Sequence, residues 1–250
     1  MSTSVARALG VLGLLARDEG RSATLAQLAR DLGAPKSSLH AVLRALASAR
    51  FLEVDHGAYR LGLAAFEVGA AYLRGVTPLR AAAPELPGLA QQLGATAHFA
   101  IVDGPHAVYL AKEDPPGEAV LLASAVGARL PAHLTAIGRA CLAHAAPSAV
   151  DAQDLSLLGA LGGPMARRDL QVVLATVRKR GYAVDEGETA ASIRCVAAPV
   201  FDAAGSCCGA IGVSYLRHGG LPAGKVAPAV RAAAARVSER LGATSAEAAG

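Results

Sequence analysis

The amino-acid sequence predicts two folded parts: a small, mostly α-helical N-terminal domain ending in a β-hairpin, and a larger α+β domain with an antiparallel sheet. Apolar residues recur at helical spacing through the first fifty positions. Later strand-like runs are instead grouped in hairpins and flanked by helical segments. The chain has 250 residues, 53% of them hydrophobic, which supplies apolar material for one or two cores and excludes a disordered protein.

Three helices are expected in the N-terminal part. The first spans about residues 4–18 and is closed by Gly20. The second begins at Thr24, with Gln27 three residues later in a capping-box pattern, and ends at Gly33. The third occupies about residues 35–49 and begins at a proline, a residue favoured in the first helical turn.

The third helix has one apolar and one polar face. Its apolar residues fall at i, i+3, i+4 and i+7 and predict a buried stripe: Leu39, Val42, Leu43 and Leu46. A short helix, a tight turn and a second helix that starts with a lysine and hydroxyls predict a helix-turn-helix, whose second helix enters the DNA major groove. The residues expected to contact DNA from this helix are Lys36, Ser37, Ser38, His40 and Arg44.

A hairpin follows the third helix. Two strand-like runs, Phe51–Val54 and Tyr59–Leu61, are joined across a turn that contains aspartate and glycine. As the wing of a winged helix-turn-helix, this hairpin would place His56 and Arg60 near phosphates or the minor groove. A three-helix module that binds another protein is the alternative for this segment.

The distribution of charge favours a polyanionic partner for the N-terminal part. Residues 1–62 carry eight Lys and Arg against five Asp and Glu, whereas residues 63–250 carry 16 against 15. Of the net charge of +4, therefore, +3 lies in the first quarter of the chain.

The larger part follows a helical connector over residues 62–77. Its first helix, about Arg80–Leu93, contains internal prolines and is expected to start late or to kink. Further helices are expected at Thr135–Ala145, Arg168–Arg180 and Pro222–Leu241. The expected strands are Ala97–Val102, Val108–Lys112, Val120–Ser124, Tyr182–Asp185, Val196–Phe201 and Gly209–Leu216.

Cysteine usage and hydropathy favour a reduced, cytoplasmic protein. The four cysteines show neither a disulfide framework nor C-x-x-C spacing, and no metal or cofactor is expected. An apolar run at residues 8–16 faintly resembles a signal peptide, but charged residues follow where a cleavage site should be. Because no stretch approaches about 18 uninterrupted apolar residues, no membrane span is expected.

Several segments resemble the IclR family of bacterial transcriptional regulators. In the N-terminal part they are Ser4–Leu9, Thr24–Ala29, Leu32–Ser38 and Tyr59–Gly62. In the second half, Val126–Ala140 resembles the family's effector-loop signature and Arg194–Asp202 its core strand. The resemblance covers roughly residues 4–242 in the family's order and spacing.

This resemblance implies four segments: a winged helix-turn-helix at 1–62, a linker helix at 63–77, a GAF-like effector domain at 78–243 and a flexible tail at 244–250. It implies a regulator without catalysis, whose effector domain binds a small organic acid and alters binding to double-stranded operator DNA. It also implies homodimers, often paired into homotetramers, on a palindromic operator. Whether the protein represses or activates is left open.

The loop before residue 135 supplies a physical reason for acid binding. A helix beginning near Thr135 would offer unpaired N–H groups and the positive end of its dipole to a carboxylate. By resemblance, the effector-binding residues would be His133, Thr135, Ala136, Ile137, Asp185, Cys195, Gly212 and Ser214. Gly212 stands where the family usually has a serine, which removes a donor and is expected to add room for a bulkier acid. Ala41 stands where the family often has an arginine, so one DNA contact is expected to be missing.

Two other functions remain alternatives at this point. A cysteine-dependent enzyme would use Cys195 as nucleophile, His133 as base and Asp185 as orienting acid, although Cys195 is predicted inside a strand. The third function is an interaction adaptor that does not bind DNA. Purely structural roles also stay open for the residues of this site. His133 would then stabilise its loop, Cys195 would be a buried hydrophobic residue, and Asp185 and Glu188 would be solvated turn residues.

Overall fold

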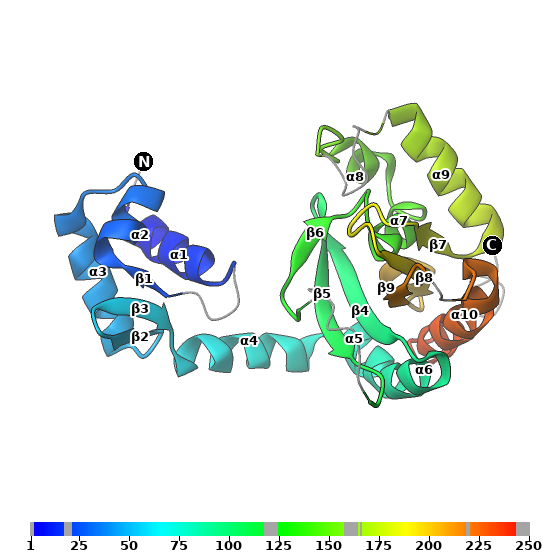
Figure 1. Ribbon diagram of the computed structural model, residues 1–250, viewed down its shortest axis with the longest axis horizontal. Helices are drawn as coiled ribbons and strands as arrows, with labels where there is room; N and C mark the ends of the chain where they lie inside the picture. Colours follow the sequence, from blue (N-terminus) through cyan, green and yellow to red (C-terminus); the bar gives the residue numbers. More distant parts are fainter. Residues whose placement is uncertain are drawn as a thin grey trace. The chain divides into compact units, whose positions relative to one another are not determined.

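A computed structural model describes residues 3–17, 22–117, 125–157, 165, 167–218 and 221–243. The chain divides into two compact units, Met1–Gly75 and Val76–Gly250, and each is described by itself (Figure 1). The predicted strand Val120–Ser124, the glycine expected to close the first helix and the tail at 244–250 lie outside the described residues.

The first unit is a winged helix-turn-helix, as predicted. Its helices are α1 (Ser4–Leu15), α2 (Leu25–Asp31), α3 (Lys36–Ser48) and α4 (Leu63–Gly75). A small antiparallel sheet in the order β1-β3-β2 consists of β1 (Ala23–Thr24), β2 (Leu52–Asp55) and β3 (Ala58–Leu61). The sequence did not predict β1, because a two-residue strand exists only through its pairing with β3.

Local sequence explains most of this unit. Thr24 Oγ1 accepts a hydrogen bond from Gln27 N at 3.3 Å, and Gln27 Oε1 accepts one from Thr24 N at 2.7 Å, so the capping box forms. The predicted stripe on α3 is buried at Leu39, Val42 and Leu43. The α1 helix ends at Leu15 instead of about residue 18, because Leu15 is its last buried apolar residue and Arg17 is exposed.

The turn between β2 and β3 has two consecutive residues with positive φ, His56 at 48° and Gly57 at 80°. This combination is characteristic of type I′ hairpin turns, in which the twist of the turn matches the twist of the strands. The wing is therefore a tight hairpin with His56 at its tip.

The second unit contains a six-stranded antiparallel sheet in the order β6-β5-β4-β9-β8-β7. The strands are β4 (Thr96–Asp103), β5 (His106–Glu113), β6 (Arg129–Pro131), β7 (Ala183–Asp185), β8 (Ile193–Phe201) and β9 (Cys207–Leu216). Its helices are α5 (Thr77–Ala82), α6 (Leu86–Leu93), α7 (Ala136–Leu142), α8 (Pro147–Asp151), α9 (Arg167–Arg180) and α10 (Ala223–Arg240).

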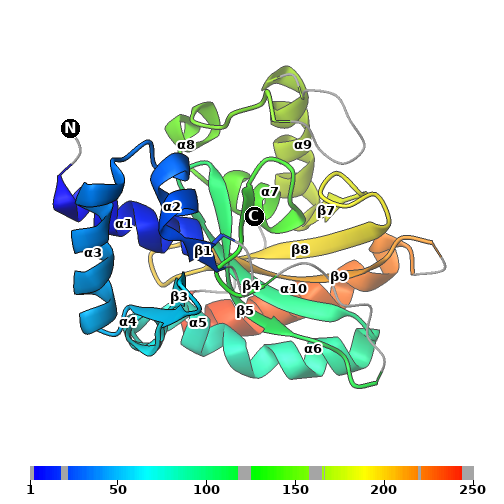
Figure 2. The same ribbon diagram turned by 60° about the vertical axis from the view of Figure 1, so that its left-hand side comes forward.

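Helices cover both faces of this sheet. Figure 2 shows α7 on one face, with α9 beyond it, and α6 and α10 on the other face. All seven residues of α7 are buried, because the helix lies between the sheet and α9. This α+β architecture confirms the fold class predicted from the sequence.

Several predicted elements differ from the observed ones. The segment Arg80–Leu93, expected to start late or to kink, is interrupted at its prolines: α5 is followed by a 3₁₀ turn at Ala83–Glu85 and then by α6, because Pro84 and Pro87 lack the N–H groups that a continuous helix needs. The structure also contains β6 and α8, which the sequence did not indicate. In the part of the chain that the structure describes, no helix is both long and apolar enough to cross a membrane.

Candidate functional site

The site begins at the N-terminus of α7. Thr135 is the N-cap residue, and its Oγ1 accepts a hydrogen bond from Gly138 N at 2.8 Å. The N–H groups of Ala136 and Ile137 lie in the first turn, where the helix itself offers no acceptor for them. Two backbone donors without an acceptor inside the helix therefore lie at one end of a buried helix.

A pocket adjoins this first turn. Its described walls are formed by His98 (β4), Tyr109 (β5), Ala136 and Ile137 (α7), Cys195 to Ala197 (β8), and Gly212 to Ser214 (β9). Five of the eight predicted effector-binding residues thus line one pocket: Ala136, Ile137, Cys195, Gly212 and Ser214. Side chains nearly fill it, leaving room for about one water molecule at most.

Gly212 does not enlarge the pocket as expected from the sequence. A Cβ at this position would lie 2.7 Å from Val196 O and 2.8 Å from Ala197 Cβ, both on the neighbouring strand. Glycine at 212 therefore allows close packing of β8 against β9, and the space it leaves is already occupied.

His98 and Tyr109 were missed in the sequence, although a histidine within the apolar run 97–102 was an available signal. Their rings meet edge to face, with centroids 5.3 Å apart. Burial, helped by the charge of Lys112, lowers the pKa of His98 to about 4, and burial raises the pKa of Tyr109 well above its ordinary value. Both are therefore uncharged polar groups at neutral pH.

Cys195 is a half-buried, protonated thiol. Ser214 Oγ donates a hydrogen bond to Cys195 Sγ at 3.1 Å. Burial, reinforced by the nearby charge of Asp185, raises the pKa of Cys195 to about 12. A thiol of this kind is not a nucleophile at neutral pH, which argues against the cysteine-dependent enzyme.

Asp185 is paired with the pocket residue Cys195 between β7 and β8, and it organises the turn that follows β7. Its Oδ1 accepts hydrogen bonds from the N–H groups of Gly187 at 2.9 Å and Glu188 at 2.6 Å, and its Oδ2 accepts one from the Thr189 hydroxyl. Burial and the neighbouring Glu188 raise its pKa to about 6. Since Asp185 is fully buried, the reading of this residue as a solvated turn residue is wrong.

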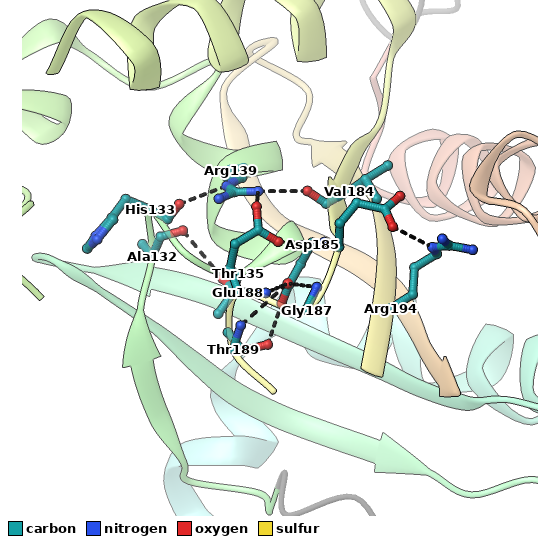
Figure 3. Close-up of polar contacts among 11 residues, drawn as sticks. Ala132, His133, Thr135, Arg139, Val184, Asp185, Gly187, Glu188, Thr189 and Arg194 are labelled. Atoms are coloured by element: carbon teal, nitrogen blue, oxygen red, sulfur yellow. Dashed lines mark hydrogen bonds and ion pairs between the residues drawn. The ribbon is translucent and has the colours of Figure 1, made fainter. Parts of the chain in front are cut away.

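Arg139 joins three parts of the site (Figure 3). Its Nε donates to His133 O at 2.7 Å, and its Nη1 donates to Val184 O at 2.9 Å and to Glu188 Oε1 at 2.8 Å. Only 3% of its side chain is exposed. Burial alone would raise the pKa of Glu188, but hydrogen bonds with Asp185 and Arg139 hold it below its ordinary value.

His133 is buried but does not line the pocket. Figure 3 shows its imidazole directed away from Asp185 and from the turn after β7. Its carbonyl oxygen, rather than its ring, takes part in the Arg139 network. Burial lowers the pKa of the imidazole, so the ring is neutral at pH 7. His133, Thr135 and Asp185 are thus not among the described lining residues of the pocket, whereas the other five predicted effector-binding residues are.

In the first unit, the candidate DNA-contacting residues lie on α3 and the wing. On α3, Lys36, Ser37, His40 and Arg44 are exposed, whereas Ser38 is half-buried. The two wing residues already have acidic partners: His56 Nδ1 lies 2.5 Å from Asp55 Oδ1, and Arg60 Nη2 lies 2.8 Å from Glu53 Oε2. Within the described ranges of the chain, the positive charge of this set that has no acidic partner is therefore concentrated on α3.

Comparison with known proteins accounts for both units. Residues 4–56 match the IclR helix-turn-helix domain, and residues 70–239 match the bacterial transcriptional regulator IclR C-terminal domain. The transcriptional regulator XynR of Escherichia coli is 31% identical over 80% of each chain, and the regulator BhcR of Paracoccus denitrificans is 33% identical over 83% of this chain and 75% of its own. The solved structure of an IclR regulator from Alicyclobacillus acidocaldarius is 27% identical, covers all of both chains and has a TM-score of 0.83.

The match extends over both units, and these relatives are named as transcriptional regulators, not as enzymes. The chain therefore belongs to the IclR family of DNA-binding transcriptional regulators.

Proposed function

We propose that this regulator is controlled by a small organic acid, which binds in the pocket beside α7 and changes the affinity for operator DNA. The observation that carries this proposal is the convergence of five predicted residues, from α7, β8 and β9, on one pocket. The effector would act by favouring one arrangement of the protein over another.

The chemistry of the pocket suits a carboxylate held by dipoles. The N–H groups of Ala136 and Ile137, the hydroxyl of Ser214 and the neutral rings of His98 and Tyr109 surround it. No Lys or Arg is among its described lining residues. Because the pocket is narrow, an acid would enter only when the walls move apart. An IclR homologue of the same fold from Microbacterium hydrocarbonoxydans has been solved with the carboxylic acid 4-hydroxybenzoate.

A screen of carboxylic acids against the full chain tests this proposal. An acid present at about 100 times its dissociation constant should stabilise the protein by about 2.7 kcal/mol, which a thermal-shift assay detects. Ser214→Ala should weaken binding of that acid by about five- to tenfold, because one hydrogen-bond donor is lost. Ser206→Ala, an exposed serine in the β8–β9 turn, is the control. If Ser214→Ala and Ser206→Ala bound the acid with equal affinity, the acid would not bind beside Ser214.

DNA binding is proposed to depend on α3 more than on the wing. Lys36→Ala should lower operator affinity and reduce the slope of log affinity against log salt by about 1, since one phosphate contact is lost. Lys225→Ala, an exposed lysine of the second unit, should leave both quantities unchanged. If Lys36→Ala left the slope of log affinity against log salt unchanged, Lys36 would not contact a phosphate of the DNA. A wild-type chain that binds no DNA from its own genomic neighbourhood would favour the adaptor.

We also propose that the protein is a homodimer that can pair into a tetramer. The 13-residue helix α4 has no buried residue, although Leu63, Phe66, Val68 and Tyr72 are apolar. On α1, Val5 and Leu9 are exposed as well. Apolar surface of this extent supports coverage by a second copy, and a two-fold dimer suits a palindromic operator.

A further inference from the structure

A second concave surface lies apart from the effector pocket. It is a cleft of about 360 Å3 between the C-terminal end of α9, one side of α10 and the end of β8. Its floor is formed by Ala198, Pro199 and Phe201 of β8 together with Ala234 and Ser238 of α10. None of its described lining residues also lines the effector pocket.

The rim of this cleft is strongly cationic. Arg178, Lys179 and Arg180 come from the end of α9, and Arg231 comes from α10. A Cβ on Gly181 would lie 2.9 Å from Arg231 Nε, so this guanidinium reaches the residue that terminates α9. No Asp or Glu is among the described lining residues.

Within the described part of the chain, none of these four cations forms an ion pair. Arg178 Nη1 donates to Ala143 O at 2.7 Å, and Arg180 Nε donates to Tyr182 O at 2.6 Å. The guanidinium of Arg180 also lies over the Tyr182 ring, 4.4 Å from its centroid, so both arginines are oriented by groups without a formal negative charge. His144 also lines the cleft, and its buried Nε2 has no hydrogen-bond partner among the described residues. Four like charges around one concavity repel one another, and an anion would relieve that repulsion.

We propose that this cleft is a binding site for a small multivalent anion, such as a phosphorylated or polycarboxylate metabolite. The volume lies at the lower end of the range for small-molecule sites, and two or more guanidinium groups suit bidentate contacts with phosphate or carboxylate. The hollow shape favours a small molecule over the convex backbone of a DNA duplex. An anion bound by Arg178 would compete with the hydrogen bond from Arg178 to the carbonyl oxygen of Ala143. Because Ala143 is the C-cap residue of α7, this hydrogen bond connects the cleft to the helix beside the effector pocket.

Calorimetric titration of the full-length protein with inorganic pyrophosphate, at constant ionic strength, tests the proposal. Wild-type protein should bind it saturably. The double variant Lys179→Ala/Arg231→Ala removes two exposed cations and should weaken binding at least about 50-fold, since each charge-assisted bond contributes roughly tenfold or more. Lys225→Ala, also exposed on α10 but outside the cleft, should change the affinity less than about twofold if the cleft, rather than general surface charge, binds the probe.

A parallel titration with citrate distinguishes the two sources of anionic groups. Tighter binding of pyrophosphate assigns the site to phosphorylated anions, and tighter binding of citrate assigns it to polycarboxylates; either result supports the proposal. Absence of saturable binding of both probes, or equal weakening by Lys225→Ala, would overturn it. It would also be overturned if the double variant lowered operator affinity as Lys36→Ala does while wild-type protein bound neither anion, because the surface would then contact nucleic acid.

Discussion

Gly138→Ala is expected to prevent the second unit from folding stably. A Cβ at position 138 would lie well inside contact distance of the carbonyl oxygen and Cα of Ala132, which are backbone atoms that cannot rotate away. The helix α7 could then no longer pack against the 131–135 loop, and its Thr135 cap would be displaced. We expect a loss of about 4 kcal/mol or more in the free energy of unfolding, at the upper end for single substitutions. Urea denaturation followed by circular dichroism measures it.

Gly88→Ala provides the matched control. Gly88 also lies within a helix of the second unit, α6, but a Cβ there would meet nothing within 4 Å. Because alanine favours the helical backbone by up to about 1 kcal/mol over glycine, this variant should be as stable as wild type or slightly more stable. A Gly138→Ala protein with wild-type stability would show that α7 does not approach the loop as described.

Arg139→Met is expected to cost about 3 kcal/mol of stability, because a buried partner of Glu188 is removed. Two carbonyl groups, those of His133 and Val184, also lose their donor. The double variant Arg139→Met/Glu188→Gln should recover part of the loss, because the uncompensated carboxylate is gone. Urea denaturation of the two variants and of Glu188→Gln gives the coupling free energy, which we expect to lie between about 1 and 3 kcal/mol.

Arg129→Met is the control for the loss of an ion pair. Arg129 Nη2 lies 2.8 Å from Asp103 Oδ2, as close as the pair in the site, but about half of each side chain or more is exposed. Its removal should cost less than about 1 kcal/mol, since exposed pairs contribute little. Similar losses in the free energy of unfolding for Arg129→Met and Arg139→Met would mean that burial does not determine how much the contacts of Arg139 contribute to stability.

The features that the sequence predicted best depend on residues close together in the chain. The α3 stripe, the Thr24 capping box and the wing turn all involve positions within a few residues of one another. Their spacing alone specifies the geometry, because helical and hairpin periodicities are local properties. The order of the sheet strands and the shape of the pocket, by contrast, are set by contacts between distant segments.

Arg139 illustrates why part of the site was missed. Its acceptors Val184 and Glu188 are 45 and 49 residues further along the chain. A lone arginine within an apolar helix was a visible signal, but nothing in its neighbourhood identified its partners. Likewise, β6 is a three-residue strand that exists through pairing with β5, and its own sequence contains no strand pattern. The prediction of extra space at Gly212 was wrong for the same reason, because residues of β8, which are distant in the sequence, occupy that space.

The central claim is that a small acid bound beside α7 changes the affinity for DNA. Its most direct test is the operator dissociation constant of the full chain at fixed salt, measured with and without a carboxylic acid shown to bind the protein. We predict a change of at least about fivefold, within the usual range of coupling between two sites, and loss of that change in Ser214→Ala at the same acid concentration. An acid that saturates the pocket and leaves the operator affinity unchanged would contradict the claim.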